Sequence, residues 1–231
     1  MKIFTYTMVF DTGFAPAVYN MELSLACCKT ILRHSIHKAL GSDENIYMVG
    51  LCGQQLIDRN NLEKELLYQP VYIAKVSDAI CTDKYYSDKK YKNRPDVQYE
   101  YKNEEWYYTP NNPHHSHKNQ KSSEKLNNPQ AEKDIYYIYG SKRCLNYSII
   151  CDEYIKFGKN IPKDLPNVFD KISKIQRKSP RSYRVVSNLL DSNEMNEFVD
   201  FFNNNKDKYK NENTIDKYFI DKISCGERHC R

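Results

Sequence analysis

The first residues of the chain follow the pattern of a buried strand. Residues 2–10 alternate β-branched and aromatic side chains and contain neither Gly nor Pro. Such a run predicts a strand that is covered on both faces. The pattern stops at Asp11, and the segment 11–13 can turn sharply because Gly13 tolerates a positive φ. Pro16 then disfavours helical backbone at the residue before it, so Phe14 is expected on a stiff loop.

A helical pattern follows this loop. Ser24 is a typical N-cap residue. Apolar residues after it recur at helical spacing, namely Leu25, Cys28, Ile31 and Leu32. In such a helix Lys29 and Arg33 share one face. The order of strand, loop and helix N-terminus is typical of sites that bind small polar or anionic ligands. We therefore expect Asp11, Phe14, Lys29 and Arg33 to converge on one site.

The same four residues also have a purely structural interpretation. Asp11 can cap a turn and Phe14 can fill the core. Lys29 and Arg33 can be solvated side chains on an exposed helix face. The sequence leaves this alternative open.

Further apolar segments bounded by turn residues predict more strands. They span 45–51, 70–81, 135–139 and 148–157. A short helix is expected over 62–68, between the first two. At least five strands, one early helix and late helices predict an α+β domain with a mixed or antiparallel sheet. A partly closed barrel is one arrangement that such strands can form.

The chain is expected to divide near residue 166. Residues 1–166 are interpreted as one domain with a polar loop over about 109–134, and 167–231 as a basic strip with a helical extension packed on the same domain. A core of about 150 residues buries roughly 70% of its unfolded surface, which is enough to fold unaided. A helix capped by Ser192 has one apolar face, formed by Met195, Phe198, Val199 and Phe202. That face can pack on the sheet or dock a protein partner.

Several short motifs are shared with a known family. They are Asp-Thr-Gly-Phe-Ala-Pro at 11–16, Leu-Ala-Cys-Cys-Lys at 25–29 and Arg33. In sequence and spacing they resemble the nucleotide modification associated domain 2 family, and the resemblance extends over about residues 3–166. The chain departs from the family at Ala17-Val18, where Asn-Pro is usual, at Thr30, which replaces a proline, and at Leu23, which replaces a cysteine. An activity that used that asparagine or cysteine would be lost here.

The resemblance implies a biological setting and leaves the reaction open. The family is known from bacterial and phage gene neighbourhoods concerned with modified bases in DNA. We therefore expect a role in nucleotide or DNA base modification, or in defence against phages. A nucleotide or DNA is the expected partner, and no cofactor is identified.

Two classes of function fit this setting. The first is a binding module that stacks a base on an aromatic ring and holds its phosphate with basic residues. Its candidate ligand-binding residues are Gly13, Phe14, Lys29, Arg33 and Tyr154. The second is an enzyme that acts on a nucleotide or modified base, with Asp11 or His115 as general base. A structural subunit that docks a partner protein is a third possibility.

Charge adds a candidate contact to nucleic acid. The net charge of +5 is modest, but residues 171–184 hold six cations and no acid. A phosphate backbone attracts such a basic strip through counterion release. Candidate contacts to nucleic acid are Arg177, Lys178, Arg181 and Arg184. A solvated linker is the alternative.

Other features exclude common functions. The N-terminus lacks the apolar core of a signal peptide and no apolar run is long enough to cross a membrane, so we expect a cytoplasmic protein without a membrane partner. The eight scattered cysteines suggest reduced thiols. Cys225 and Cys230 lack a second ligand pair, so no metal site is expected. The motifs of P-loop NTPases, dinucleotide-binding proteins and esterases are absent from the sequence.

Overall fold

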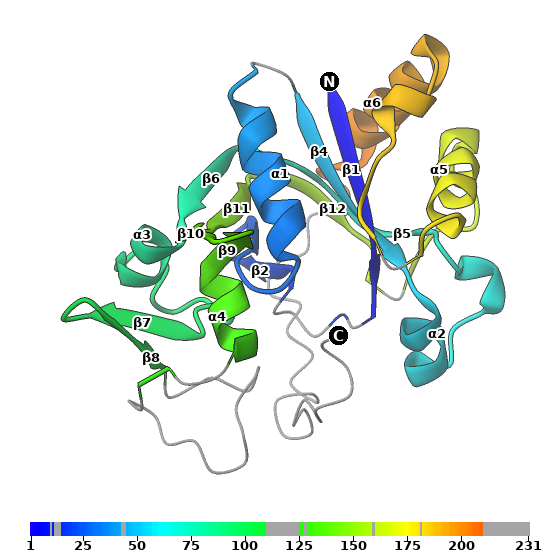
Figure 1. The fold of residues 1–231 in the computed structure, drawn as a ribbon. Coiled ribbons are helices and arrows are strands. Elements are labelled where there is room, and N and C mark those ends of the chain that lie inside the picture. Colours follow the sequence, from blue (N-terminus) through cyan, green and yellow to red (C-terminus); the bar gives the residue numbers. More distant parts are fainter. Residues whose placement is uncertain are drawn as a thin grey trace.

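Two β-sheets and a central helix organise the fold (Figure 1). The computed structural model describes residues 1–9, 11, 15–42, 45–109, 125–126, 129–158, 160–180 and 182–209. Helix α1 (Thr30–Leu40) is contacted by strands of both sheets. The other helices are α2 (Gln54–Asn60), α3 (Thr82–Ser87), α4 (Pro129–Ile135), α5 (Asn167–Arg177) and α6 (Ser192–Asn205).

The larger sheet has five strands in the order β12-β5-β4-β1-β13. They are β1 (Lys2–Met8), β4 (Ile46–Cys52), β5 (Pro70–Lys75), β12 (Glu153–Lys156) and β13 (Arg184–Val185). β1 and β4 are parallel, whereas β5 is antiparallel to β4 and β12 is antiparallel to β5. β1, β4 and β12 therefore run in one direction and end at the same edge of the sheet. We call this the carboxyl edge.

The smaller sheet has four strands in the order β2-β3-β11-β6. They are β2 (Ala17–Tyr19), β3 (Glu22–Leu25), β6 (Asp78–Cys81) and β11 (Tyr147–Cys151). Two hairpins complete the strands, β7 (Tyr99–Lys102) with β8 (Glu105–Tyr108) and β9 (Tyr136–Tyr139) with β10 (Lys142–Leu145).

Helices cover both faces of the larger sheet. On one face the ring of Tyr47 packs edge-on against Phe198 and Phe202 of α6, with ring centroids 5.2 Å apart in both pairs. On the same face the hydroxyl of Thr5 donates to the side chain of Gln176 in α5 at 2.8 Å. Helix α1 packs on the opposite face. Neighbouring residues of a strand point to opposite faces, so alternate positions of β1 and β4 face α1.

The structure confirms the predicted α+β class and the mixed sheet. The partly closed barrel is wrong, because none of the described sheets closes on itself. The predicted strands over 70–81 and 148–157 are each two strands that belong to different sheets, β5 and β6 in one case and β11 and β12 in the other. In each case the chain passes from one sheet to the other within one predicted strand.

The helix predicted to begin at Ser24 begins later. Ser24 lies in β3, where its hydroxyl accepts a hydrogen bond from Arg94 at 2.6 Å and donates to Asp96. Helix α1 starts at Thr30, after Cys28 and Lys29 adopt left-handed backbone with φ of 57° and 46°. Lys29 is thus the N-cap of α1 and does not share a helix face with Arg33.

The C-terminal helix packs on the sheet. Asp191 and Glu194 form a capping box at the start of α6, so the cap lies one residue before the predicted Ser192. Phe198 and Phe202 of the predicted apolar face are fully buried. The apolar face is therefore used within the chain.

Candidate functional site

A row of residues in register crosses the larger sheet near the carboxyl edge. Tyr6 pairs with Gly50, Gly50 pairs with Tyr72, and Tyr72 pairs with Lys156. Residues paired across a sheet point to the same face, so these side chains all face α1. Gly50 has no side chain, and the two tyrosine rings meet above it. Their hydroxyl oxygens lie 2.8 Å apart, with Tyr72 donating to Tyr6.

Both tyrosines are deeply buried. Burial raises the pKa of Tyr6 and of Tyr72 well above the ordinary tyrosine value, and the nearby charge of Asp11 adds to the effect in both. Both hydroxyls therefore stay protonated at neutral pH. The two hydrogen-bonded hydroxyls form a buried polar pair near the end of β1.

Asp11 forms an ion pair with Lys156 near this tyrosine pair. Its Oδ1 lies 3.2 Å from Nζ of Lys156, and the side chains of Lys156 and Asp11 are only 2% and 11% exposed. Asp11 follows β1 and Lys156 ends β12, so the pair links two strand ends at the carboxyl edge. Gly158 lies beside this ion pair and has a φ of +58°. A Cβ atom at this position would lie 3.7 Å from Asp11 Oδ2.

The side chain of Lys29 also lies near Tyr6 and the end of β1. Its Nζ donates to the carbonyl of Thr7 at 3.3 Å and lies 4.9 Å from the centroid of the Tyr6 ring. Neither contact is an ion pair, and no described carboxylate forms one with this ammonium group. Burial lowers the pKa of Lys29, whereas the nearby Cys28 acts in the opposite direction. Lys29 is thus a partly desolvated cation held by a carbonyl and a ring face.

A buried carboxylate fixes the turn that carries Lys29. Asp134 accepts from the backbone N–H of Cys28 at 2.6 Å and from the hydroxyl of Tyr99 at 2.7 Å. The thiols of Cys27 and Cys28 are hydrogen-bonded, and this bond together with burial raises the pKa of Cys27. The left-handed turn before α1 is therefore held by tertiary contacts.

Arg33 is directed away from the carboxyl edge. Its side chain is fully buried, and its Nε, Nη1 and Nη2 donate to the carbonyls of Cys28, Tyr147 and Asp134 at 2.8, 2.7 and 2.6 Å. These bonds tie the turn before α1 to β11 and α4. Its predicted contact with a ligand stays a prediction.

The other predicted site residues fall into two groups. Tyr154 is fully buried in β12, two residues before Lys156 and on the same face. Its contact with a ligand is untested. Gly13, Phe14 and His115 lie outside the described residues. Asp11 and Lys29 therefore both lie near Tyr6, whereas the hydrogen bonds of Arg33 go to the turn before α1, to β11 and to α4.

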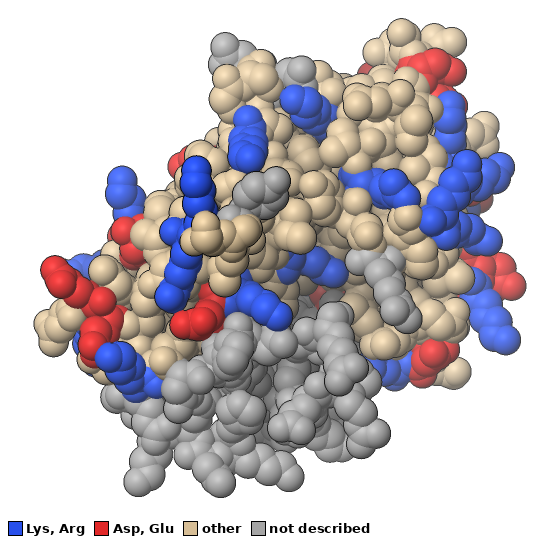
Figure 2. Space-filling model, in the orientation of Figure 1, with Lys and Arg blue, Asp and Glu red and all other residues tan. Residues whose placement is uncertain are grey.

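The basic strip begins on a helix. Arg177 and Lys178 are exposed at the end of α5, and the Arg177 guanidinium lies 5.6 Å from the centroid of the Tyr68 ring. Arg184 is half-buried in β13 and donates to the hydroxyl of Ser179. Arg181 lies outside the described residues. In Figure 2, Lys and Arg side chains gather on the side of the molecule that carries α5.

Sequence reasoning missed several members of the site. Tyr6, Tyr72 and Lys156 were part of predicted strands and were not chosen as site residues. Two signals were available: Gly50 interrupts an apolar strand, which marks a close approach of other atoms, and Lys156 is the single cation of the predicted strand 148–157.

The described residues contain no group of three or more His, Cys, Asp or Glu side chains that could hold a metal ion. Their helices are all too short or too polar to cross a bilayer. None of the six cysteines among them forms a disulfide.

Comparison with known proteins identifies the family. Residues 1–216 match the family described as nucleotide modification associated domain 2. Searches of curated proteins and of solved structures give no match. The family match covers the whole site, from β1 to α6, and its description associates the domain with nucleotide modification. The chain belongs to the nucleotide modification associated domain 2 family.

Proposed function

We propose that the protein binds a nucleotide at the carboxyl edge of the larger sheet, with Lys29 contacting its phosphate. The observation that carries this proposal is the environment of the Lys29 ammonium group. It is partly buried, and it lies against the carbonyl of Thr7 and the ring of Tyr6, neither of which carries a negative charge.

A partly buried cation without a counter-charge is costly, and an anion that binds beside it removes this cost. The start of α1 adds to the attraction, because the first turn contains no acidic residue and its backbone N–H groups favour negative charge. The anion of a nucleotide is its phosphate. Asp11 is already paired with Lys156, so it does not compete for Lys29.

The base is expected on the loop after β1. Phe14 is the proposed stacking partner, with Gly13 allowing the close approach, and both lie outside the described residues. The family description associates the domain with nucleotide modification, which supports a nucleotide as the ligand. Within that setting we propose a role in DNA base modification or in defence against phages.

A second candidate is catalysis on the bound nucleotide with Asp11 as general base. The ion pair with Lys156 holds this carboxylate at the same edge as Lys29. The predicted alternative base, His115, lies outside the described residues. If Asp11 is the base, Asp11→Asn retains nucleotide binding and loses any change in nucleotide mass. Conversion by Asp11→Asn at the wild-type rate would rule this role out.

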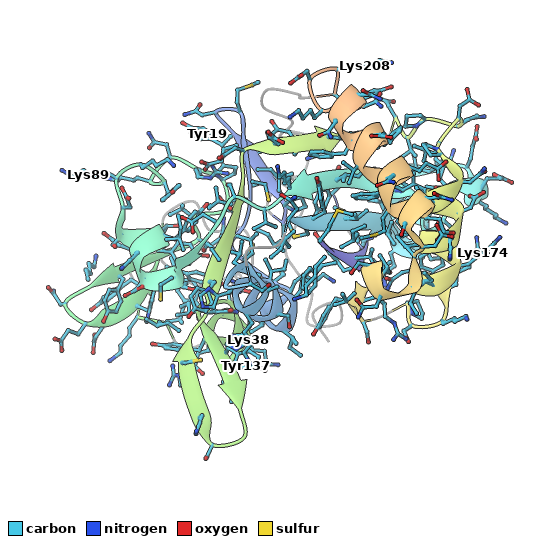
Figure 3. The ribbon with its side chains drawn as sticks, turned by 90° about the horizontal axis from the view of Figure 1, so that it is seen from above. Tyr19, Lys38, Lys89, Tyr137, Lys174 and Lys208 are labelled. Atoms are coloured by element: carbon cyan, nitrogen blue, oxygen red, sulfur yellow. The ribbon has the colours of Figure 1, made fainter. Side chains whose placement is uncertain are left out.

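Calorimetric titration tests the binding proposal. The ligands are dAMP, dCMP, dGMP and dTMP, and the proteins are the wild type, Lys29→Gln and the control Lys38→Gln. Lys38 is exposed in the last turn of α1 (Figure 3). A charged hydrogen bond contributes about 1.5–3 kcal/mol, so we expect Lys29→Gln to weaken binding roughly 10- to 100-fold and Lys38→Gln to leave it unchanged. Failure of the wild type to bind any of the four, or wild-type affinity in Lys29→Gln, would refute the proposal.

A further inference from the structure

We infer that the bound nucleotide belongs to a single-stranded polynucleotide whose neighbouring phosphates contact the cations at the end of α5. This inference rests on the proposed function, because it extends the ligand of the carboxyl edge from a mononucleotide to a chain. The observations that carry it are the absence of ion pairs between these cations and the described carboxylates, and the position of the cations beside β1.

The cations at the end of α5 are not neutralised within the described part of the chain. Lys174, Arg177 and Lys178 are exposed, and none of them forms an ion pair with a described carboxylate. Two lysines nearby differ. Lys163 pairs with Glu63 at 3.0 Å and Lys171 with Glu194 at 2.5 Å. Three neighbouring cations at the end of α5 thus lack an ion pair within the described residues, as expected of a surface that binds phosphates.

These cations lie beside the half of β1 that leads to the site. Gln176, next to Arg177, accepts from the hydroxyl of Thr5, and Arg184 of β13 pairs with Thr5 in register. Thr7, whose carbonyl holds Lys29, is two residues further along β1, a distance of about 7 Å. Lys29 lies on the α1 face and the cations lie on the α5 face. β13, the outermost strand of the sheet beside β1, has only two residues. An extended chain can therefore pass around it from one face of the sheet to the other.

An aromatic ring accompanies the charge. The guanidinium of Arg177 lies over the ring of Tyr68, which is half-buried, at 5.6 Å from its centroid. Grooves that bind single strands combine cations for the backbone with rings on which bases stack. A base that reaches the carboxyl edge also has to leave its partner, because atoms of a paired base are shielded within the duplex. A single strand therefore fits both features.

Fluorescence anisotropy tests the inference with a labelled 12-nucleotide DNA of mixed sequence, the RNA of the same sequence and the corresponding DNA duplex. The proteins are the wild type, the triple variant Lys174→Ala/Arg177→Ala/Lys178→Ala and a matched control, Lys84→Ala/Lys89→Ala/Lys92→Ala. The control removes three exposed lysines, and Figure 3 shows Lys89 on the side of the molecule opposite Lys174.

We expect the wild type to bind a single strand at least tenfold more tightly than the best mononucleotide and more tightly than the duplex. Each lost phosphate contact lowers the slope of log K against log salt by about 0.7 for single strands, so the triple variant should lose about 2. The control should keep the wild-type slope. The relative affinities for DNA and RNA identify which polynucleotide is bound.

The outcomes separate this inference from the proposed function. An unchanged slope in the triple variant, or tighter binding of the duplex, overturns the inference while mononucleotide binding through Lys29 can stand. If binding depends on the cations at the end of α5 but is unaffected by Lys29→Gln, the link between these cations and the carboxyl edge is overturned. We expect the triple variant to bind the mononucleotide like the wild type, because its cations lie on the other face of the sheet.

Discussion

The hydroxyl of Tyr72 donates a hydrogen bond to the hydroxyl of Tyr6 at 2.8 Å across a strand to which neither residue belongs. The contact is possible because the residue between them on β4 is Gly50. The ring of Tyr6 in turn lies beneath the ammonium group of Lys29. The position of the proposed phosphate contact therefore depends on three strands of the sheet.

Replacement of Gly50 by alanine should disrupt this arrangement. A Cβ at position 50 would lie 2.1 Å from Cε1 of Tyr72 and 2.5 Å from Sδ of Met8, so the Tyr72 ring would have to move. Overpacking of this kind costs about 1–3 kcal/mol of unfolding free energy, and nucleotide affinity should fall as well. Urea denaturation measures the first effect. Gly41→Ala is the control, because its nearest neighbour is Lys38 O at 3.8 Å. Equal stability of the two variants would contradict the packing described for Gly50.

Arg33→Lys should destabilise the protein although it preserves the charge. Three donors of the buried guanidinium satisfy three carbonyls, and an ammonium on a shorter side chain cannot reproduce that geometry. Carbonyls left unsatisfied in the interior cost about 1–3 kcal/mol each. We expect the free energy of unfolding to fall by at least about 2 kcal/mol. A variant that unfolds at the wild-type urea concentration would show that these bonds do not stabilise the turn before α1.

Lys29→Met should separate stability from binding. Because burial lowers the pKa of Lys29 in the folded protein, the unfolded chain binds more protons between that lowered value and 10.5. The stability of the wild type should therefore rise with pH through this window, and Lys29→Met should lack the rise. At pH 7 the variant should be at least as stable as the wild type and should bind nucleotide roughly 10- to 100-fold more weakly. Loss of stability at pH 7 would show that Lys29 stabilises the folded protein.

Two histidines of α1 should make stability depend on pH. The His34 ring stacks on Tyr137 at 3.8 Å and the His37 ring on Tyr147 at 3.5 Å. Burial is the main cause that lowers the pKa of both, and the charge of Lys38 adds to the effect on His34. The unfolded chain then binds more protons below pH 6.5, so the wild type should lose stability as the pH falls from 6.5.

The variant His34→Phe/His37→Phe keeps an aromatic ring at both positions and cannot titrate. Thermal unfolding at pH 7.5, 6.5 and 5.0 should show a growing advantage of this variant as the pH falls. An equal loss in both proteins would assign the acid sensitivity to other groups.

Periodicity predicted the elements whose burial is regular. β1, β4 and the apolar face of α6 follow their patterns closely, because each has residues that are uniformly buried or buried at every third or fourth position. The start of α1 could not be predicted in this way. Cys28 and Lys29 are not residues that favour left-handed backbone, and the N–H of Cys28 is satisfied by Asp134, 106 residues away.

The site was predictable only in part. Asp11 and Lys29 belong to motifs near the N-terminus, so the sequence pointed to them. Tyr72 and Lys156 come from strands that are adjacent only after the sheet has formed, and their register with Tyr6 is not visible in one sequence. Helix α4 lies in the segment expected to be a polar loop. Its first residue is Pro129, a position where proline often begins a helix.

The coupling between Lys29 and the phosphate tests the central claim most directly. For the mononucleotide that binds best, the affinity of the 5′-monophosphate is compared with that of its nucleoside by calorimetry, in the wild type and in Lys29→Gln. If Lys29 contacts the phosphate, the wild type should prefer the monophosphate by about 10- to 100-fold, and the preference should nearly vanish in Lys29→Gln. The same preference in both proteins would contradict the claim.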